Sequence, residues 1–197
     1  MTTIRSFIAI ELSDEARSVL TDLQNRLKAV VPPKTVRWTA PDNIHLTLHF
    51  LGDVALNDVE QVGDIVRVVG SNCQPFTLTL TGLGCFPNSR RPRILWAGIG
   101  GKTKPLLALH RNLSEQLNMI GFIPEARAYS PHLTIGRVRN GVPRRHLTQL
   151  GEMLDQEKLV IGELVALKVN QISLIKSELK PAGAVYTSLT HGKFQGS

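Results

Sequence analysis

The sequence predicts an α+β protein in which two sheet lobes share one cleft. Strand-like and helix-like segments follow one another irregularly, with strand content throughout, which favours α+β over a regular βαβ array. The pattern His-apolar-Thr-apolar occurs twice, beginning at His45 and at His132. The copies are separated by close to half of the chain, and each half offers a strand, a helix and a His-x-Thr strand. A pseudo-symmetric pair of lobes that each donate one motif to the cleft follows from this faint repeat.

Length and composition fit a soluble globular protein. The chain has 197 residues, of which 42% are hydrophobic, so one domain spanning residues 1–197 can bury a substantial core. The only cysteines, Cys73 and Cys85, indicate a reducing compartment and leave a single disulfide open. The first apolar run is too short for a signal sequence, and no segment approaches the roughly 20 apolar residues of a membrane span. We therefore expect a cytoplasmic protein without a membrane segment.

The first half begins with a buried strand over residues 6–11 and a helix capped by Ser13, with acidic residues in its first turn. Pro32 and Pro33 end that helix. Residues 36–39 and 44–51 are predicted as strands, the second ended by Gly52. A capping-box pattern of Asn57 and Glu60 predicts the start of the next helix. The two helices show apolar residues at helical spacing: Ala16, Val19, Leu20, Leu23, Leu27 and Val30, then Val59, Val62, Val66 and Val69.

The second half repeats this alternation. Residues 76–83 alternate between apolar and polar and predict a half-buried strand, followed by a strand over residues 94–99. A helix is expected from Thr103 to Gly121, and the second motif lies on a strand over His132–Val138. Pro143 suits the first turn of a helix that runs to about Glu157. Single strands near residues 164–176 and 185–190 complete the prediction.

The two His-x-Thr motifs are the candidate site. Successive side chains on a strand point to opposite faces, so His45 and Thr47 share one face, as do His132 and Thr134. Each pair offers an imidazole beside a hydroxyl, with apolar residues behind them. Two such pairs facing each other would surround a small anion with two acid/base groups and two neutral donors. This arrangement favours phosphate chemistry without a metal or another cofactor.

Competing interpretations are weaker. His45 and His49 form an HxxxH pattern, which on a helix could bind zinc. The segment alternates like a strand, however, and would hold the two histidines about 13 Å apart. Ser130, Cys73 and Cys85 lack the neighbours of an activated nucleophile. The remaining histidines are expected to be structural or exposed: His110, His146 and His191.

The charge balance points to a polyanionic partner. The net charge is +7 and the isoelectric point is about 9.8, which would speed the capture of a nucleic acid. Basic residues cluster at residues 90–93, 137–139 and 144–146, where each cluster alone is more typical of a solvated surface. Trp38, Phe50 and Trp96 could stack on bases, although core packing is the more common role for each.

These motifs resemble those of the 2H phosphoesterase superfamily, which is defined by two His-x-Thr/Ser-x motifs. More closely, the chain is similar to bacterial and archaeal RNA 2′,3′-cyclic phosphodiesterases, also called 2′-5′ RNA ligases. The resemblance covers nearly the whole chain, and both motifs are intact. The segments that carry it are residues 5–10, 36–39, 43–52, 84–87, 91–98, 130–137 and 177–179, with Gly183 and Tyr186 downstream.

The resemblance implies a bilobal fold of two mostly antiparallel sheet lobes, flanked by helices, around a central groove. It also implies hydrolysis of RNA 2′,3′-cyclic phosphate ends, or of small cyclic nucleotides, to 2′-phosphates, with His45 as general acid and His132 as general base. Thr47 and Thr134 would donate hydrogen bonds to the non-bridging oxygens. Arg137 is a secondary phosphate-binding candidate, because strand alternation places it opposite Thr134 unless a twist or bulge intervenes. The reverse reaction could give weak 2′-5′ RNA ligation.

A non-catalytic nucleotide- or RNA-binding module using the same groove is the alternative function. The intact His/Thr pairs argue against it, because simple phosphate capture favours arginine and lysine. We expect a monomer, since neither lobe needs a partner.

Overall fold

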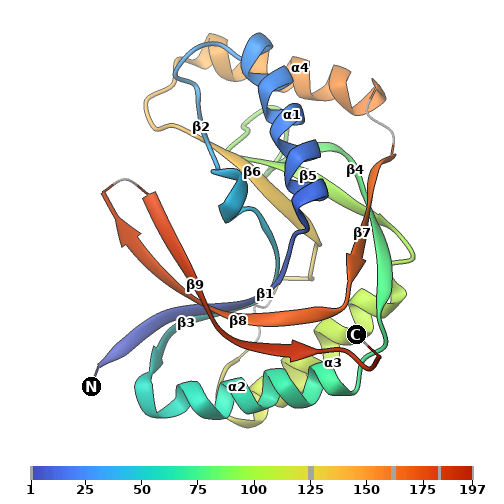
Figure 1. Cartoon of the computed structure of the whole chain (residues 1–197). Coiled ribbons are helices and arrows are strands. Elements are labelled where there is room, and N and C mark those ends of the chain that lie inside the picture. Colours follow the sequence, from blue (N-terminus) through green and yellow to red (C-terminus); the bar gives the residue numbers. More distant parts are fainter. Residues whose placement is uncertain (1, 124–126, 161–162, 182, 197) are drawn as a thin grey trace.

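A computed structural model, shown in Figure 1, describes residues 2–123, 127–160, 163–181 and 183–196. Its strands form one antiparallel sheet in the order β7-β4-β5-β6-β3-β1-β8-β9, with β2 paired to β6. The strands are β1 Thr3–Glu11, β2 Val36–Trp38, β3 His45–Ala55, β4 Phe76–Phe86, β5 Ile94–Gly101, β6 His132–Val138, β7 Glu163–Val169, β8 Gln171–Lys180 and β9 Gly183–Lys193. The helices are α1 Asp14–Val30, α2 Leu56–Ser71, α3 Lys104–Met119 and α4 Arg144–Val160, with a 3-10 turn at Pro41–Asn43.

The sheet has two halves that correspond to the predicted lobes. One half is β7-β4-β5-β6 and the other is β3-β1-β8-β9, and they join between β3 and β6 through the single residue pair Leu46 and Leu133. Both leucines are fully buried. The two strands that carry the motifs are therefore the seam of the molecule, and the predicted α+β fold with two sheet lobes is confirmed.

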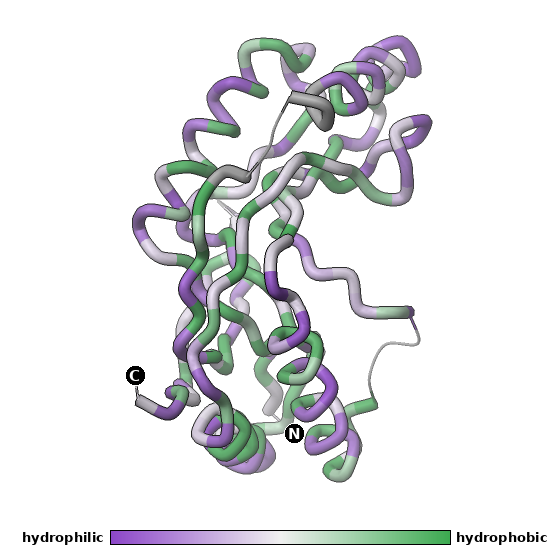
Figure 2. The backbone as a smooth tube through the Cα atoms, turned by 90° about the vertical axis from the view of Figure 1, so that its right-hand side faces the viewer, coloured by the Kyte–Doolittle hydropathy of each residue, from purple (hydrophilic) through white to green (hydrophobic). Residues whose placement is uncertain are grey.

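Two helices cover each half. In Figure 1, α2 and α3 lie together beside the β3-β1-β8-β9 half, whereas α1 and α4 lie at the other half. Hydrophilic and hydrophobic residues alternate along these helices in Figure 2, as expected for helices with one face on a sheet. In α3, for example, the buried positions are Leu106, Leu109, Leu113 and Leu117. Among the described residues, no helix is long and apolar enough to cross a membrane.

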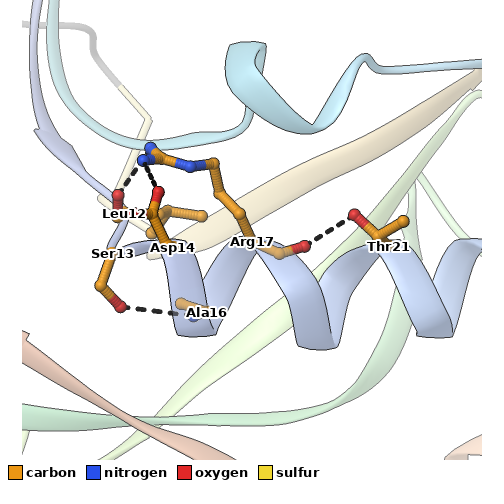
Figure 3. A network of polar contacts seen from close by, with 6 residues as sticks. All are labelled: Leu12, Ser13, Asp14, Ala16, Arg17 and Thr21. Atoms are coloured by element: carbon orange, nitrogen blue, oxygen red, sulfur yellow. Dashed lines mark hydrogen bonds and ion pairs between the residues drawn. The ribbon is translucent and has the colours of Figure 1, made fainter.

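Helix α1 begins as its sequence predicts. The Ser13 hydroxyl accepts a hydrogen bond from the Ala16 amide at 3.3 Å, which satisfies one of the unpaired donors of the first turn. Arg17 reaches back to the Leu12 carbonyl at 2.7 Å and also contacts Asp14 (Figure 3). These contacts fix the angle at which the chain leaves β1 and crosses to the other half of the sheet.

The start of α2 differs from the prediction. Strand β3 continues through Gly52 to Ala55, and α2 follows at once, with no side-chain cap from Asn57. The Leu56 amide instead donates to the Thr2 carbonyl at 3.2 Å. Gly52 has φ of +70° at a register shift between β1 and β3, so it marks a bulge rather than the end of the strand. The capping-box prediction was wrong because the helix begins one residue before Asn57, and its first amide is bonded to the backbone carbonyl of Thr2, the residue before β1.

The predicted single strand near residues 164–176 is two strands. β7 ends at Val169 and pairs with β4, whereas β8 begins at Gln171 and pairs with β1. The segment therefore passes from one half of the sheet to the other at Asn170. The break has no glycine or proline and is marked only by the polar pair Asn170 and Gln171, so it lacks the usual sequence signal of a turn. Cys73 and Cys85 form no disulfide.

Candidate active site

A cavity of about 360 Å³ lies at the seam between the two halves of the sheet. It is lined by residues of β3, β6 and the segments around them, including all five residues that the sequence singles out: His45, Thr47, His132, Thr134 and Arg137. The structure therefore brings together side chains from motifs that are far apart in the sequence.

The register of β3 and β6 explains this convergence. Leu46 and Leu133 pair directly and are buried, so the residues on either side of each leucine face the cavity. In an antiparallel pair, one step outward from this contact sets His45 beside Thr134 and Thr47 beside His132. The two histidines consequently occupy diagonal corners of a four-residue floor. Neither threonine hydroxyl has a hydrogen-bond partner among the described residues, so both are available to a ligand.

A bulge in β3 determines that Phe50, rather than His49, lies on the same face of the strand as Thr47. Across β1, Thr47 pairs with Ala9 but His49 pairs with Ile8, so Leu48 is an extra residue in β3. The bulge reverses the strand's alternation. Phe50 then pairs with Phe7 on the cavity side, whereas His49 lies opposite a core residue and is only 6% exposed. The prediction that His45 and His49 do not form a metal pair rests on ideal strand spacing. The bulge buries His49 opposite Ile8, although His49 is still one of the residues that line the cavity.

A matching bulge in β6 brings Arg137 to the cavity. Across β5, Trp96 pairs with Thr134 and Leu95 pairs with Gly136, so Ile135 is the extra residue. This is the irregularity that Arg137 requires to reach the side of Thr134, and Arg137 does line the cavity. Strand alternation in the sequence shows that Arg137 needs an irregularity to reach the cavity, but the sequence does not reveal the bulge itself.

Buried Gln24 of α1 holds the β6 bulge in place. Its side-chain amide donates to the Ile135 carbonyl and to the Thr39 carbonyl, each at 2.8 Å, and its side chain is 1% exposed. The Thr39 amide also donates to the Ile135 carbonyl at 3.0 Å. A bulge leaves backbone groups without strand partners, so these bonds supply what the ladder cannot. Gln24 is a site-supporting residue that sequence analysis missed, because one glutamine on a helix carries no signal.

Each bulge falls at the fourth residue of its motif, Leu48 in one and Ile135 in the other. Phe50 and Arg137 are therefore equivalent positions of the pseudo-symmetric halves, each two residues beyond its bulge. The symmetry holds for the histidines and threonines and breaks at this position, where one half supplies an aromatic ring and the other a guanidinium group.

Backbone carbonyls fix the tautomers of both histidines. His45 Nδ1 lies 3.0 Å from the Asn43 carbonyl, and His132 Nδ1 lies 2.7 Å from the Ser130 carbonyl. A carbonyl oxygen only accepts, so each Nδ1 carries a hydrogen and donates it. Each Nε2 is then left as the nitrogen that takes up or gives a proton in the cavity.

The two rings have different surroundings. His45 stacks on Phe7 with ring centroids 4.5 Å apart and meets the edge of Tyr186 at 5.3 Å. Burial lowers the pKa of His45 to about 4, although the Asn43 carbonyl and the Glu11 carboxylate oppose this shift. Empty, the cavity therefore holds His45 in its neutral form at pH 7.

Aromatic rings of the other half surround His132. Phe86 meets it edge-on at 4.9 Å, and Trp96 lies at 6.4 Å. Trp96 itself packs directly over Gly84, where a Cβ would overlap the indole ring. These contacts orient the imidazole from the side that the β4-β5 hairpin provides.

Tyr129 and His110 are further cavity residues that sequence analysis did not place. The Tyr129 hydroxyl donates to the Thr47 carbonyl at 3.1 Å, and its ring stacks on His110 at 3.9 Å. Burial raises the pKa of the Tyr129 hydroxyl and lowers the pKa of His110. Both therefore stay neutral near pH 7. His110 was expected to be structural or exposed, and it is structural, but it also lines the cavity.

The three candidate stacking aromatics have different positions. Phe50 is 58% exposed and lines the cavity, so the expectation that it packs in the core was wrong. The bulge at Leu48 is the reason. Trp38 packs against the core and Trp96 against Gly84 and Phe86, as expected. Among the described residues, no three His, Cys, Asp or Glu side chains converge to hold a metal ion.

The sequence matches the family described as LigT like Phosphoesterase over residues 10–96 and again over residues 100–186, so each half of the chain matches it separately. A protein of Methanothermobacter thermautotrophicus named RNA 2′,3′-cyclic phosphodiesterase is 34% identical over 186 residues, which cover 94% of this chain and 96% of that protein. A protein of the same name from Aquifex aeolicus is 30% identical, with 95% of each chain covered.

Solved structures share the fold. A protein of Thermus thermophilus superposes with a TM-score of 0.80 at 26% identity, covering 98% of this chain and 99% of that one. LigT of Escherichia coli, in its apo form, superposes with a TM-score of 0.75 at 25% identity over the same shares.

Proposed function

The chain belongs to the LigT-like phosphoesterase family, and on that premise we propose that it hydrolyses the 2′,3′-cyclic phosphate end of RNA to a 2′-phosphate. One observation carries the proposal: the two His-x-Thr motifs face one another in a single cavity, with the Nε2 atom of each histidine left free by a bond at Nδ1. The names of the relatives support the choice of an RNA 2′,3′-cyclic phosphate over other phosphodiesters.

The diagonal placement of the histidines suits in-line displacement at phosphorus. A phosphate on the four-residue floor has one imidazole on each side. His132 Nε2 takes a proton from water as the new bond from water oxygen to phosphorus forms. The bond from phosphorus to the 3′ oxygen breaks, and His45 Nε2 gives its proton to that oxygen. Each proton transfer of this kind typically contributes about 10²–10⁴-fold.

Three other residues bind the phosphate in this mechanism. Thr47 and Thr134 donate hydrogen bonds to the non-bridging oxygens, and Arg137 supplies a positive charge beside them. Donors aimed at the position where charge develops lower the barrier more than donors aimed at the ground state. Both hydroxyls are held by strands rather than loops, so little reorganisation is needed.

The low pKa of His45 makes its role depend on substrate. A donor must be protonated when the ring opens, whereas His45 has a pKa of about 4 in the empty cavity. One negative charge about 4 Å from the imidazolium, at an effective dielectric constant of about 20, stabilises the charged form by about 4 kcal/mol, or about three pKa units. The bound phosphodiester thus raises the pKa of His45 to about 7. Substrate binding itself therefore protonates His45, which stays neutral in the empty cavity at the same pH.

A non-catalytic binding module is not favoured. Such a site would gain more from arginine and lysine than from two histidines with fixed tautomers. If a 5′-hydroxyl takes the place of water, its oxygen bonds to the phosphorus of the cyclic end, the bond to the 3′ oxygen breaks and a 2′-5′ phosphodiester results, so the same site is compatible with weak 2′-5′ RNA ligation.

Product identification tests the proposal. Phosphorus NMR of a 2′,3′-cyclic dinucleotide incubated with the protein and excess chelator should show conversion to the 2′-phosphate alone. Accumulation of the 3′-phosphate, or complete loss of turnover with chelator, would contradict the stated mechanism.

We also propose that the protein acts as a monomer in the cytoplasm. Both motifs come from one chain, so the site needs no second copy, and the two cysteines form no disulfide. Light scattering that gives a mass near 21.7 kDa would support the monomer, and a mass of twice that value would refute it.

A further inference from the structure

We propose that four arginines beside the cavity bind the phosphate backbone of the RNA strand that leads to the cyclic end. Arg90, Arg91 and Arg93 lie on the loop between β4 and β5, and Arg144 is the first residue of α4; we call these four the arginine surface. The inference rests on the proposed function and extends it from the terminal phosphate to the strand behind it.

The arginine surface lines a hollow of about 880 Å³. All four arginine side chains are exposed, and within the described residues none of them forms an ion pair. Glu152 and Asp155 also line the hollow, so it has an excess of two positive charges. Unpaired guanidinium groups are well suited to phosphate oxygens, because their planar donors match that geometry.

The loop that carries three of the arginines is anchored on both sides. The Arg93 amide donates to the Phe86 carbonyl at 2.7 Å, and the Asn88 side chain accepts from the Arg91 amide at 3.1 Å. On α4, Gly151 packs so closely on the Ser89 carbonyl that a Cβ there would overlap it. Binding by a preorganised loop loses less conformational entropy than binding by a flexible one.

The loop of the arginine surface adjoins the catalytic cavity. Phe86 and Ile94 flank the loop, pair with each other and line the cavity. Phe86 contacts the His132 ring, and Ile94 pairs with Arg137 on β6. The loop that carries three of the arginines therefore begins and ends beside the wall of the cavity, and its neighbour Ile94 pairs with the strand position of Arg137. An RNA chain whose last phosphate sits between the histidines meets these groups as it leaves the cavity on this side.

The experiment compares substrates of two lengths. The double variant Arg90→Ala/Arg91→Ala should hydrolyse a cyclic mononucleotide with kcat/KM within twofold of the unaltered protein, because the cavity is unchanged. For a cyclic-ended RNA of about eight nucleotides, a length that one basic groove can track, kcat/KM should fall about five- to tenfold at moderate salt. The slope of log kcat/KM against log salt should decrease by about 1.4, because each of the two phosphates that the variant no longer neutralises accounts for about 0.7.

Two variants control for charge and folding. Lys102→Ala/Lys104→Ala removes the same charge beyond the opposite end of β5 and should leave the length effect intact. Arg90→Lys/Arg91→Lys keeps the charge and should retain most of the preference for the longer substrate. A loss no larger than that of the lysine control, or an equal loss on both substrates, overturns the proposal.

The failure of the proposed function would look different. If the unaltered protein hydrolyses neither substrate, fluorescence anisotropy with a labelled 3′-phosphorylated RNA of the same length decides the role of the surface. Weaker, less salt-dependent binding by Arg90→Ala/Arg91→Ala supports it, and unchanged binding overturns it.

Discussion

Filling the cavity with a phosphodiester should change the charge of His45. In the empty protein, burial beneath Phe7 and Tyr186 lowers its pKa to about 4. A single negative charge about 4 Å away contributes about 332/(20 × 4), or about 4 kcal/mol, in favour of the imidazolium. That energy corresponds to about three pKa units, so the pKa of His45 in the complex should be near 7.

Linkage gives the sign of the effect on affinity. Because binding raises this pKa, His45 takes up a proton when the anion binds at a pH between its pKa in the free protein and its pKa in the complex. Affinity should be highest below about pH 4, fall up to tenfold per pH unit between about pH 4 and pH 7, and level off above, a total of about 10³-fold. Most of this pH dependence should disappear in His45→Gln, which cannot take up the proton.

The assay uses thymidine 3′-methyl phosphate as the ligand. It has one negative charge across the whole range and no 2′-hydroxyl, so neither phosphate ionisation nor turnover complicates the titration. Nitrogen-15 NMR of the histidine rings would follow Nε2 of His45 from pH 4.5 to 8, with and without ligand. A pKa for His45 at or above 6.5 in the free protein, or one that stays near 4 in the complex, would refute the reasoning.

Three further predictions follow from the same geometry. Gln24→Leu removes the Gln24 donor from the Thr39 carbonyl and one of two donors from the Ile135 carbonyl, so it should cost about 1–3 kcal/mol of unfolding free energy in urea titrations and also raise KM through Arg137; an unchanged KM would show that the bulge does not affect substrate binding. Phe50→Ala should raise KM for cyclic nucleotides by about 5- to 150-fold, the equivalent of about 1–3 kcal/mol of base stacking, with Tm unchanged because the ring is exposed; a lower Tm with the same KM would show that Phe50 only packs. Since the folded pKa of His45 is about 4 and the unfolded value about 6.5, the unfolded chain binds the extra proton between them; stability should therefore rise by about 3 kcal/mol from pH 4 to pH 6.5 and stay level above, and His45→Gln should flatten this slope in urea titrations at pH 4.5 and 7.

Local patterns predict the motif strands well. The second motif occupies His132–Val138, as the sequence predicts, and Ser13 caps α1. The strand depends on short-range alternation of apolar and polar residues, and the cap depends on one side chain that bonds to a nearby amide. The placement of His45, Thr47, His132 and Thr134 on one floor likewise follows from strand alternation once the two leucines between them pair.

What the sequence does not predict depends on distant contacts. Whether Arg137 and Phe50 face the cavity is decided by one extra residue in each strand, and the bulge at Ile135 is held by Gln24 more than a hundred positions away along the chain. The apparent cap at Asn57 fails because the helix already begins at Leu56, whose amide donates to the distant Thr2 carbonyl. Burial of His45 comes from Phe7 and Tyr186, at opposite ends of the sequence, so its low pKa has no local signature.

The central claim is that two residues of a symmetric motif do unequal work, with His45 giving the proton and His132 taking one. A cyclic substrate with sulfur in place of the bridging 3′ oxygen tests it, because a thiolate, with a pKa near 8.5 for its thiol, leaves without a donor. With the oxygen substrate, His45→Ala and His132→Ala should each lower kcat by about 10²–10⁴-fold. With the sulfur substrate, His45→Ala should recover to within about tenfold of the unaltered protein, which removes most of that loss, while His132→Ala stays impaired. Equal impairment of both variants on the sulfur substrate, or recovery of His132→Ala instead, would contradict the assignment.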